Sequence, residues 1–484
     1  MNYKMMGRFI AQILAVEALF MLPALFISLS LREEAAVHGF LLSLLVLLFI
    51  VGVLSLLCRG AGSGFYAKEG LACVGISWIA LSLLGCLPFY FSGEIPNFVD
   101  AFFEMVSGFT TTGASILTNV ESLSHGILYW RSFSHWLGGM GVLVFLLAIV
   151  PAGGRQGGYT MHLLRAESPG PDVGKLVPRM KQTAMILYLI YILLTIVNIV
   201  FLLLGNMSLF DAVCTAFGTA GTGGFGIRND SMAGYSPYLQ NVCTVFMLLF
   251  GINFTCYYLL LMRQLRSVWK NEELRLYLGV AACSMLLIAF DVRGMYSSAG
   301  EALHHAAFQV SSIMTTTGFA TTDFDLWPTF SKTILLCLMI IGACAGSTGG
   351  GLKCGRALLL FKGLRRNIRR ILHPNRVEVV RSGGQVVDEK ILDNTNAYLA
   401  AYVIIVIASV LLISVDGFSI TTNLSAVLAC FNNIGPGFEV VGPTCSYASF
   451  GTFSKLVLIA DMLAGRLEIF PILILFSRSA WEHR

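Results

Sequence analysis

The stretch SGFTTTGAS, Ser107 to Ser115, interrupts a sequence that is otherwise strongly apolar. It places three threonines and a glycine between two segments that are apolar enough to cross a lipid bilayer. Polar backbone at membrane depth is costly unless it is buried in protein or lines water or an ion path. The stretch therefore predicts an irregular polar segment inside a membrane protein.

The composition is that of a membrane protein. Of the 484 residues, 56% are hydrophobic and 12% are charged, and the mean hydropathy is +0.76. Soluble globular proteins carry about 25% charged residues, so lipid is the solvent for most of this chain. Apolar runs of about 20 residues predict an all-α polytopic fold. We expect ten spans, near 8–30, 37–58, 71–91, 128–151, 183–205, 238–262, 276–291, 330–361, 396–415 and 453–477. The first span lacks a small-residue cleavage site, so we interpret it as an anchor and not as a removed signal.

Lys and Arg orient the predicted spans. Three connections are basic, and the connections between them are poor in Lys and Arg. Because positive loops stay in the cytoplasm, this pattern predicts that both termini are cytoplasmic. The longest basic stretch also fits a nucleic-acid-binding segment, but a topology signal on a solvated or lipid-facing helix explains it better. We therefore expect membrane lipid and no nucleic acid as partners. The basic residues are Arg155, Arg165, Lys175, Arg179 and Lys181, then Arg263, Arg266, Lys270 and Arg275, then Arg356, Lys362, Arg365, Arg366, Arg369, Arg370, Arg376, Arg381 and Lys390.

Nothing in the sequence predicts an enzyme. The twelve cysteines are scattered without a CxxC spacing, and the eight histidines lack the spacing of metal ligands. The glycines of TGGFG are not followed by GK[ST], so they do not form a phosphate-binding loop. A membrane-embedded enzyme is therefore the weaker alternative, and we expect no organic cofactor in this chain. The acids Glu17, Glu104, Asp211, Asp461 and Glu468 form no recognisable catalytic spacing.

The opening stretch recurs along the chain. MTTTGFA at 314–320 nearly repeats it, and TAGTGGFG at 219–226 and NNIGPGF at 432–438 are related to it. Each copy has an apolar span before it, a half-span leading into it and another span after it, so the unit occurs four times. One glycine from each copy gives Gly113, Gly223, Gly318 and Gly435, and the half-spans are 100–110, 210–219, 301–314 and 421–431. The predicted domains are an N-terminal helix pair (1–69) and four repeats (70–181, 182–270, 271–392 and 393–484).

Four such units in one chain predict a ring with pseudo-fourfold symmetry. A dehydrated cation needs several oxygen ligands, and rings of backbone carbonyls supply them. Glycine permits the backbone conformations that this needs, and a threonine side chain can hold the backbone or add a ligand. If the half-spans point their C-terminal ends at the axis, their dipoles favour a cation there. A single TTTG also fits a helix C-cap, but four copies at equivalent positions favour the filter. The candidate filter residues are Thr110, Thr111, Thr112, Gly113, Ala220, Gly221, Thr222, Gly223, Thr315, Thr316, Thr317, Gly318, Asn432, Asn433, Ile434 and Gly435.

The span 330–361 contains GACAGSTGGG at 342–351. Each mid-helix glycine costs up to about 1 kcal/mol relative to alanine, so this segment predicts a loop inside the membrane. Close helix packing through small residues is the alternative. The loop candidates are Gly346, Ser347, Thr348, Gly349, Gly350 and Gly351, and Lys353 follows them, placed to tether the loop on its cytoplasmic side.

Arg466 lies well inside the last predicted span, where an arginine must find a partner or water. On a helix it lies roughly 140° and 160° from Asp461 and Glu468, so it cannot easily pair with either within its own helix. We expect it to reach another helix or the ion path, with a structural salt bridge as the alternative. Asn253 inside another span predicts an interhelical hydrogen bond. The glycines of HWLGGMG (135–141) predict tight packing.

These motifs resemble those of the Trk/Ktr/HKT potassium-uptake superfamily over essentially the whole chain. The resemblance is strongest to the bacterial Trk branch, which carries two additional N-terminal helices. The matching stretches are DAFFEMVSGFTTTGAS (100–115), RSFSHWLGGMGVLVF (131–145), GTGGFG (221–226), GINF (251–254), GSTGGGLKCGR (346–356) and AGRLEIFPIL (464–473).

The resemblance implies a potassium filter with one glycine per repeat, and all four are glycine here. It implies that the loop of the third repeat and Arg466 form a gate beneath the filter. It also implies a homodimer in the bacterial inner membrane, working with a cytosolic nucleotide-binding regulatory subunit of the TrkA type. The second repeat departs from the pattern, with Ala220 and Gly221 in place of threonines. Whether transport is channel-like or coupled to protons or sodium in a symporter stays open.

Overall fold

The computed structural model describes residues 2–60, 67–141, 180–375 and 378–481. It is a bundle of helices, as predicted, and within these residues the strands β1 (Arg381–Ser382) and β2 (Gln385–Val386) form one short antiparallel hairpin. Six helical segments of the described chain are long and apolar enough to cross a membrane. They are α1 (Tyr3–Leu31), α2 (Glu34–Leu57), α3 (Ala67–Gly85) with α4 (Leu87–Phe91), α9 (Met180–Leu204), α14 (Glu272–Val292) and α18 (Glu389–Ile413).

Three of the ten predicted spans are broken. The span 238–262 divides into α11 (Pro237–Phe250) and α12 (Phe254–Leu261), which meet at 88°, and Asn253 caps α12 by accepting from the Thr255 N–H over 2.9 Å. The span 330–361 divides into α16 (Thr329–Ile341) and α17 (Cys354–Leu372). The span 453–477 divides into α20 (Thr452–Arg466) and α21 (Phe470–Phe476). Hydropathy reports how apolar a segment is and not whether its helix is continuous. The prediction of one continuous helix for each of these three segments was therefore wrong.

The predicted span 128–151 begins as α6 (His125–Gly139) and runs into residues outside the described ones. The first basic connection, 152–181, lies almost entirely outside them as well. Two short α-helices and four 3₁₀ turns complete the described chain: α13 (Leu265–Trp269), α22 (Arg478–Trp481) and the turns at 324–326, 414–416, 439–441 and 447–449.

Each predicted half-span is a short helix that begins at a side-chain cap. The four are α5 (Phe98–Phe109), α10 (Leu209–Gly221), α15 (Ala299–Met314) and α19 (Ile420–Phe431). Their caps Asn97, Ser208, Ser298 and Ser419 each accept a hydrogen bond from a backbone N–H of the first turn. Along the chain each of these helices follows one apolar helix and precedes another, in the orders α3–α5–α6, α9–α10–α11, α14–α15–α16 and α18–α19–α20, with α4 between α3 and α5.

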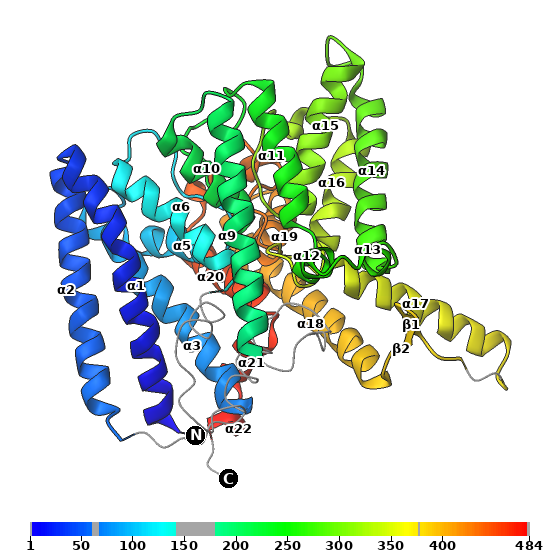
Figure 1. The fold of residues 1–484 in the computed structure, drawn as a ribbon, viewed down its shortest axis with the longest axis horizontal. Helices are drawn as coiled ribbons and strands as arrows, with labels where there is room; N and C mark the ends of the chain where they lie inside the picture. The colour runs from blue at the N-terminus through cyan, green and yellow to red at the C-terminus, as the bar shows by residue number, and fades with distance from the viewer. Residues whose placement is uncertain (1, 61–66, 142–179, 376–377, 482–484) are drawn as a thin grey trace.

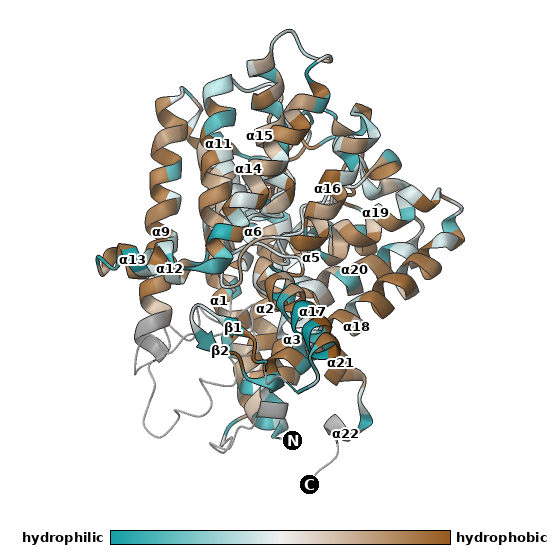
Figure 2. Ribbon diagram, turned by 90° about the vertical axis from the view of Figure 1, so that its right-hand side faces the viewer, coloured by the Kyte–Doolittle hydropathy of each residue, from teal (hydrophilic) through white to brown (hydrophobic). Residues whose placement is uncertain are grey.

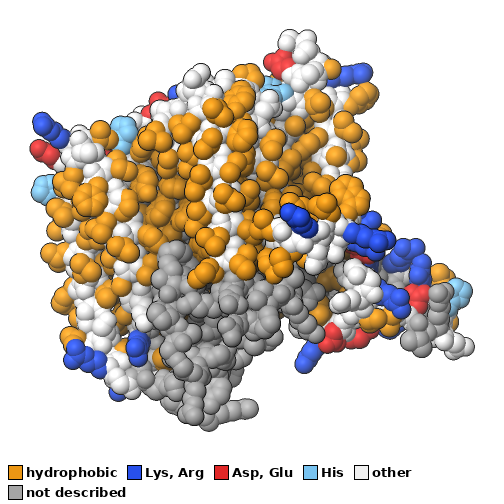
Figure 3. Space-filling model, in the orientation of Figure 1, with side chains coloured by type: hydrophobic (Ala, Val, Ile, Leu, Met, Phe, Trp, Pro, Cys, Tyr) orange, Lys and Arg blue, Asp and Glu red, His pale blue; other side chains and the backbone are white. Residues whose placement is uncertain are grey.

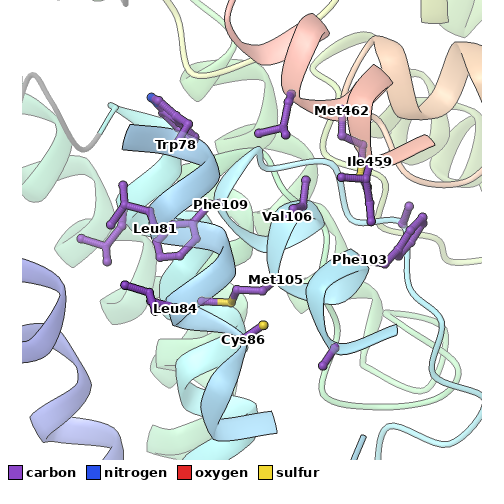
Figure 4. Close-up of a cluster of buried hydrophobic side chains, with 14 of the residues drawn as sticks. Trp78, Leu81, Leu84, Cys86, Phe103, Met105, Val106, Phe109, Ile459 and Met462 are labelled. Atoms are coloured by element: carbon purple, nitrogen blue, oxygen red, sulfur yellow. The ribbon is translucent and has the colours of Figure 1, made fainter. Parts of the chain in front are cut away.

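The first short helix, α5, lies in the protein core (Figure 4). Met105 and Phe109 face Leu81 and Leu84 of α3, and on the other side Phe103 lies beside Ile459 of α20. Phe109 and Phe103 are fully buried. The helix is too short to cross a bilayer, so packing on all sides, not lipid, holds it in place.

The outer surface suits lipid. Helices α2, α9 and α18 leave large apolar side chains exposed, among them Leu45, Leu193 and Ile404, and orange side chains cover most of the face in Figure 3. The N-terminal helices α1 and α2 lie side by side at one edge (Figure 1), with α1 against α3 and α6. Hydrophilic residues concentrate on α17 (Figure 2), where Lys362 and Arg366 pair with Glu272 and Glu389.

Candidate functional site

After each short helix the chain makes the same turn, and we call these four turns the ring loops. Each contains two residues with positive φ, first a polar residue and then, two positions later, a glycine. The pairs are Thr111 (55°) and Gly113 (81°), Thr222 (52°) and Gly224 (77°), Thr316 (60°) and Gly318 (84°), and Asn433 (56°) and Gly435 (98°). Four segments far apart in the sequence therefore share one backbone conformation, as the repeat predicted.

The second ring loop corrects the predicted register. We expected Ala220 to Gly223 to match Thr110 to Gly113, but the glycine with positive φ is Gly224. The hydrogen bonds agree: the Gly223 N–H donates to Gly218 over 2.9 Å, as the Thr112 N–H donates to Ser107 over 2.9 Å. The ring loops are therefore Thr110–Gly113, Gly221–Gly224, Thr315–Gly318 and Asn432–Gly435. Ala220 belongs to α10.

The ring loops touch one another in a closed cycle. A Cβ added to Gly113 would collide with the carbonyl oxygen of Gly223, and one on Gly224 would collide with that of Thr317. A Cβ on Gly318 would collide with the Ile434 oxygen, and one on Gly435 would lie 2.8 Å from the Thr112 oxygen. The contacts thus run from the first repeat through the second, third and fourth and back to the first. Glycine is needed at each position for two reasons, its positive φ and the neighbouring carbonyl.

The threonine hydroxyls hold the ring loops in place. Thr110 Oγ1 donates to the Val106 carbonyl over 2.7 Å and lies 2.8 Å from Thr112 Oγ1. Thr315 and Thr317 repeat this arrangement in the third loop, with Oγ1 atoms 2.8 Å apart. In the fourth loop Asn433 Nδ2 donates across to Thr112 Oγ1 over 3.0 Å.

A buried ion pair that our sequence reasoning missed supports the first two ring loops. Arg131 Nε lies 2.7 Å from Glu104 Oε1, and the Glu104 carboxylate also accepts from the Ile116 N–H over 2.9 Å. Arg131 Nη1 donates to the Gly226 carbonyl over 2.9 Å, and its guanidinium stacks on the Phe225 ring. Both charged side chains are almost completely buried. An acid inside a half-span and an arginine in RSFSHW were the available signals, because charge at that depth needs a partner.

Residues 342–353, which we call the glycine loop, are non-helical as predicted and lie against the ring. The Gly350 N–H donates to Thr316 Oγ1 over 2.6 Å. A Cβ on Gly349 would lie 2.8 Å from the Thr315 carbonyl oxygen, and one on Gly350 would collide with that of Asn432. The glycines of this loop therefore bring its backbone directly against the third and fourth ring loops, and the alternative of a continuous small-residue helix does not hold.

The glycine loop is tied on several sides. Glu273 Oε1 accepts from the Ala345 N–H over 2.6 Å, and the Gly346 carbonyl accepts from the Phe254 N–H over 3.0 Å. The buried Lys353 donates through Nζ to the Gly349 carbonyl. Of the remaining candidates, Ser347 bonds the Cys344 carbonyl and Thr348 Oγ1 bonds the Phe250 carbonyl over 3.2 Å. Gly351 has a φ of 77° that favours glycine.

Arg466 contacts three elements other than its own helix, as the helical arrangement predicted. Nη1 donates to Thr111 Oγ1 over 3.1 Å and to the Thr348 carbonyl over 2.9 Å. Nη2 donates to the Gly138 carbonyl and, over 2.8 Å, to the Gly139 carbonyl at the end of α6. A Cβ on Gly138 would collide with the Phe109 carbonyl, so this glycine serves the tight packing we expected. The side chain lies between the first ring loop and the glycine loop.

The two neighbouring acids have other partners. Asp461 Oδ1 accepts from Ser409 Oγ over 2.7 Å, and Glu468 pairs with Arg356 of α17.

Outside the membrane-spanning segments, the hydroxyls of Ser419 and Thr422 lower the pKa of Glu439. The backbone N–H of Glu439 donates to Asp325 over 3.1 Å. The bond between Glu439 and Asp325 therefore joins the third repeat to the fourth.

Four pore loops closed into a ring inside a bundle of apolar helices define a membrane transport protein of the pore-loop class. The sequence model of the family TrkH, described as "Cation transport protein", matches residues 37–482, and the chain belongs to this family. Membership places the chain among transport proteins and not among enzymes.

Similar proteins of known name agree with this family assignment. The chain is 41% identical to the Trk system potassium uptake protein TrkH of Salmonella typhimurium over 86% of both chains. It is 34% identical to the Trk system potassium uptake protein TrkG of Escherichia coli over 96% of both. Its structure superposes on the crystal structure of the potassium transporter TrkH from Vibrio parahaemolyticus with a TM-score of 0.88, at 33% identity over all of both chains. This match bears out the predicted fold, four helix–pore-helix–helix repeats around a pseudo-fourfold axis with two N-terminal helices.

Proposed function

We propose that the protein takes up potassium across the bacterial cytoplasmic membrane, with the four ring loops as its selectivity filter. The closed cycle of glycine-to-carbonyl contacts carries this proposal, because it brings one carbonyl from the equivalent position of each repeat against a glycine of a neighbouring ring loop. The names of the relatives, which describe potassium uptake, support the choice of ion.

Ring geometry and helix dipoles both favour a cation. A dehydrated potassium ion needs several oxygen ligands, and the carbonyls of Thr112, Gly223, Thr317 and Ile434 are the ones fixed by the ring contacts. The short helices α5, α10, α15 and α19 end where the ring loops begin. Their C-terminal ends carry partial negative charge, which stabilises a cation nearby. Potassium is the transported substrate here.

We propose that the glycine loop and Arg466 form the gate. The loop lies against the ring on the side where the short helices end, and Arg466 bridges the two through Thr348 and Thr111. Two unit charges about 4 Å apart repel by about 4 kcal/mol at an effective dielectric of about 20. A fixed guanidinium at this place therefore opposes the passage of a cation.

Four pore loops favour a passive, gated pore over a proton- or sodium-coupled symporter, since alternating-access symporters are typically built from two related halves. We also propose cytoplasmic termini, a homodimer and a cytosolic nucleotide-binding regulatory partner of the TrkA type. The phrase "Trk system" in the relatives' names supports a multicomponent assembly.

Potassium flux into liposomes that contain the purified protein tests the proposal. We expect uptake driven by the potassium gradient alone, with a potassium preference over sodium that Gly113→Ser reduces. Uptake that requires an imposed proton or sodium gradient would identify a symporter. No potassium uptake under any of these gradients, from folded protein that is inserted in the bilayer, would contradict the function itself.

A further inference from the structure

His135 of α6 lies between the first two ring loops and bonds the backbone of both repeats. Its side chain is fully buried. Nδ1 lies 2.8 Å from the carbonyl oxygen of Gly108, in the last turn of α5. Nε2 accepts a hydrogen bond from the Phe225 N–H over 3.2 Å, one residue after Gly224. One imidazole therefore links Gly108, which precedes the first ring loop, with Phe225, the residue after the second ring loop.

These two hydrogen-bond partners determine the protonation state and the tautomer of the His135 imidazole. A backbone carbonyl only accepts and a backbone N–H only donates, so Nδ1 carries the hydrogen and Nε2 does not. His135 is thus a neutral imidazole of one tautomer, with both nitrogens engaged. It has no nitrogen left for an ion, and its contribution to transport must come through the backbone that it holds.

The imidazole and the backbone of His135 together explain why the second repeat departs from the TTTG pattern. Where the first ring loop has Thr110 and Thr112, the second has Gly221 and Gly223. A Cβ on Gly223 would overlap the imidazole of His135, and a Cβ on Gly221 would overlap the backbone carbonyl oxygen of His135. The second ring loop therefore lacks the pair of hydroxyls that holds the first in place. The imidazole of His135 fills the space at Gly223, and the backbone carbonyl of His135 fills the space at Gly221.

We propose that His135 is a positioning residue for ion discrimination, which sets the spacing of the first two ring loops through its bonds to Gly108 and Phe225. This inference rests on the proposed function of the ring loops as a filter. Because Gly223 supplies the carbonyl that meets Gly113, a shift of the second loop changes the ring itself.

Relative uptake of potassium and sodium by protein in liposomes tests the inference. His135→Leu leaves a buried carbonyl and a buried N–H unpaired, and we expect the potassium-to-sodium uptake ratio to fall about tenfold. His135→Gln keeps a donor and an acceptor and should restore much of the ratio. Ser134→Ala is the matched control, since that neighbouring hydroxyl bonds only the Arg131 carbonyl of its own helix in the described structure. The control should keep the wild-type ratio.

His135→Asn covers the case in which His135→Leu does not fold. Asparagine can still donate to Gly108 but is too short to reach Phe225, so we expect an intermediate ratio from protein with a normal melting temperature. A wild-type ratio in folded Leu or Asn variants, beside a lowered ratio in Gly113→Ser, overturns the role of His135 and leaves the filter standing. A wild-type ratio in Gly113→Ser as well overturns the filter.

Discussion

Arg466 Nη1 lies 2.9 Å from the carbonyl oxygen of Thr348 and donates a hydrogen bond to it. This bond joins the last repeat to the glycine loop of the third, and the same nitrogen also bonds Thr111 of the first ring loop. A single cationic side chain thus contacts ring and loop together. Removing it tests both the electrostatic barrier and the attachment of the loop.

Arg466→Ala should raise potassium flux. The lost charge lowers the barrier to a cation, and a reduction of about 1.4 kcal/mol gives about a tenfold faster flux if this barrier is rate-limiting. The potassium-to-sodium ratio should stay near the wild-type value, because the ring loops are unchanged. Arg466→Lys is the control that keeps the charge and should keep flux low. Lower flux together with a lower melting temperature would show instead that Arg466 is chiefly structural.

Glu273→Ala should raise the flux measured without a regulatory partner. The variant removes the acceptor of the Ala345 N–H and loosens the glycine loop without touching the ring. An unpaired buried donor costs about 1–3 kcal/mol, which corresponds to roughly 5- to 150-fold in the open population. Glu272→Ala is a matched control one residue away, because Glu272 pairs with Lys362 of α17. Equal flux in both variants would place the gate elsewhere.

Gly224→Ser should lower ion selectivity, as we also expect for Gly113→Ser. The backbone at Gly224 has a φ of 77°, and an added Cβ would collide with the Thr317 carbonyl. Gly52→Ser is the control, since a Cβ there meets nothing within 4 Å. Potassium and sodium uptake should be compared in variants with wild-type expression. An unchanged ratio in both ring variants would argue against the filter.

Glu104→Gln should destabilise the protein, by about 3–5 kcal/mol, because Arg131 would be left as an unpaired buried charge. Thermal unfolding in detergent measures the loss. Lys332→Ala breaks the partly exposed pair with Asp325, and such pairs contribute only about 0.2–1 kcal/mol. Similar losses in the two variants would mean that the Glu104 pair contributes little.

The sequence predicted the features whose residues are unusual inside a membrane-spanning segment. Threonines and glycines at membrane depth marked the ring loops, and the clustered glycines of 342–351 marked the glycine loop. Arg466 stood out because charge in an apolar span needs a partner. The predicted register of the second loop was wrong because the sequence alone does not distinguish Gly223 from Gly224, and the backbone dihedrals and hydrogen bonds of the structure do.

The other omissions have a common cause. Arg131 and His135 bond Gly226 and Phe225 of the second repeat, and Glu104 bonds Ile116 beyond the turn of its own ring loop. One sequence without its fold does not bring such segments together. The breaks at 251–253 and 467–469 depend on backbone turns, including positive φ at Glu468 and Ile469, which apolar composition does not report.

All four ring loops come from a single polypeptide, although they repeat one conformation. In a pore built from four identical subunits, one codon change would alter every quarter of the ring at once. Here it alters one quarter, so each ring loop can diverge separately. Ile434 stands where Thr112 and Thr317 stand in other quarters, and Gly223 in a third. In the filter that we propose, an ion would therefore meet four unequal ring loops, and its preference could be changed one ring loop at a time.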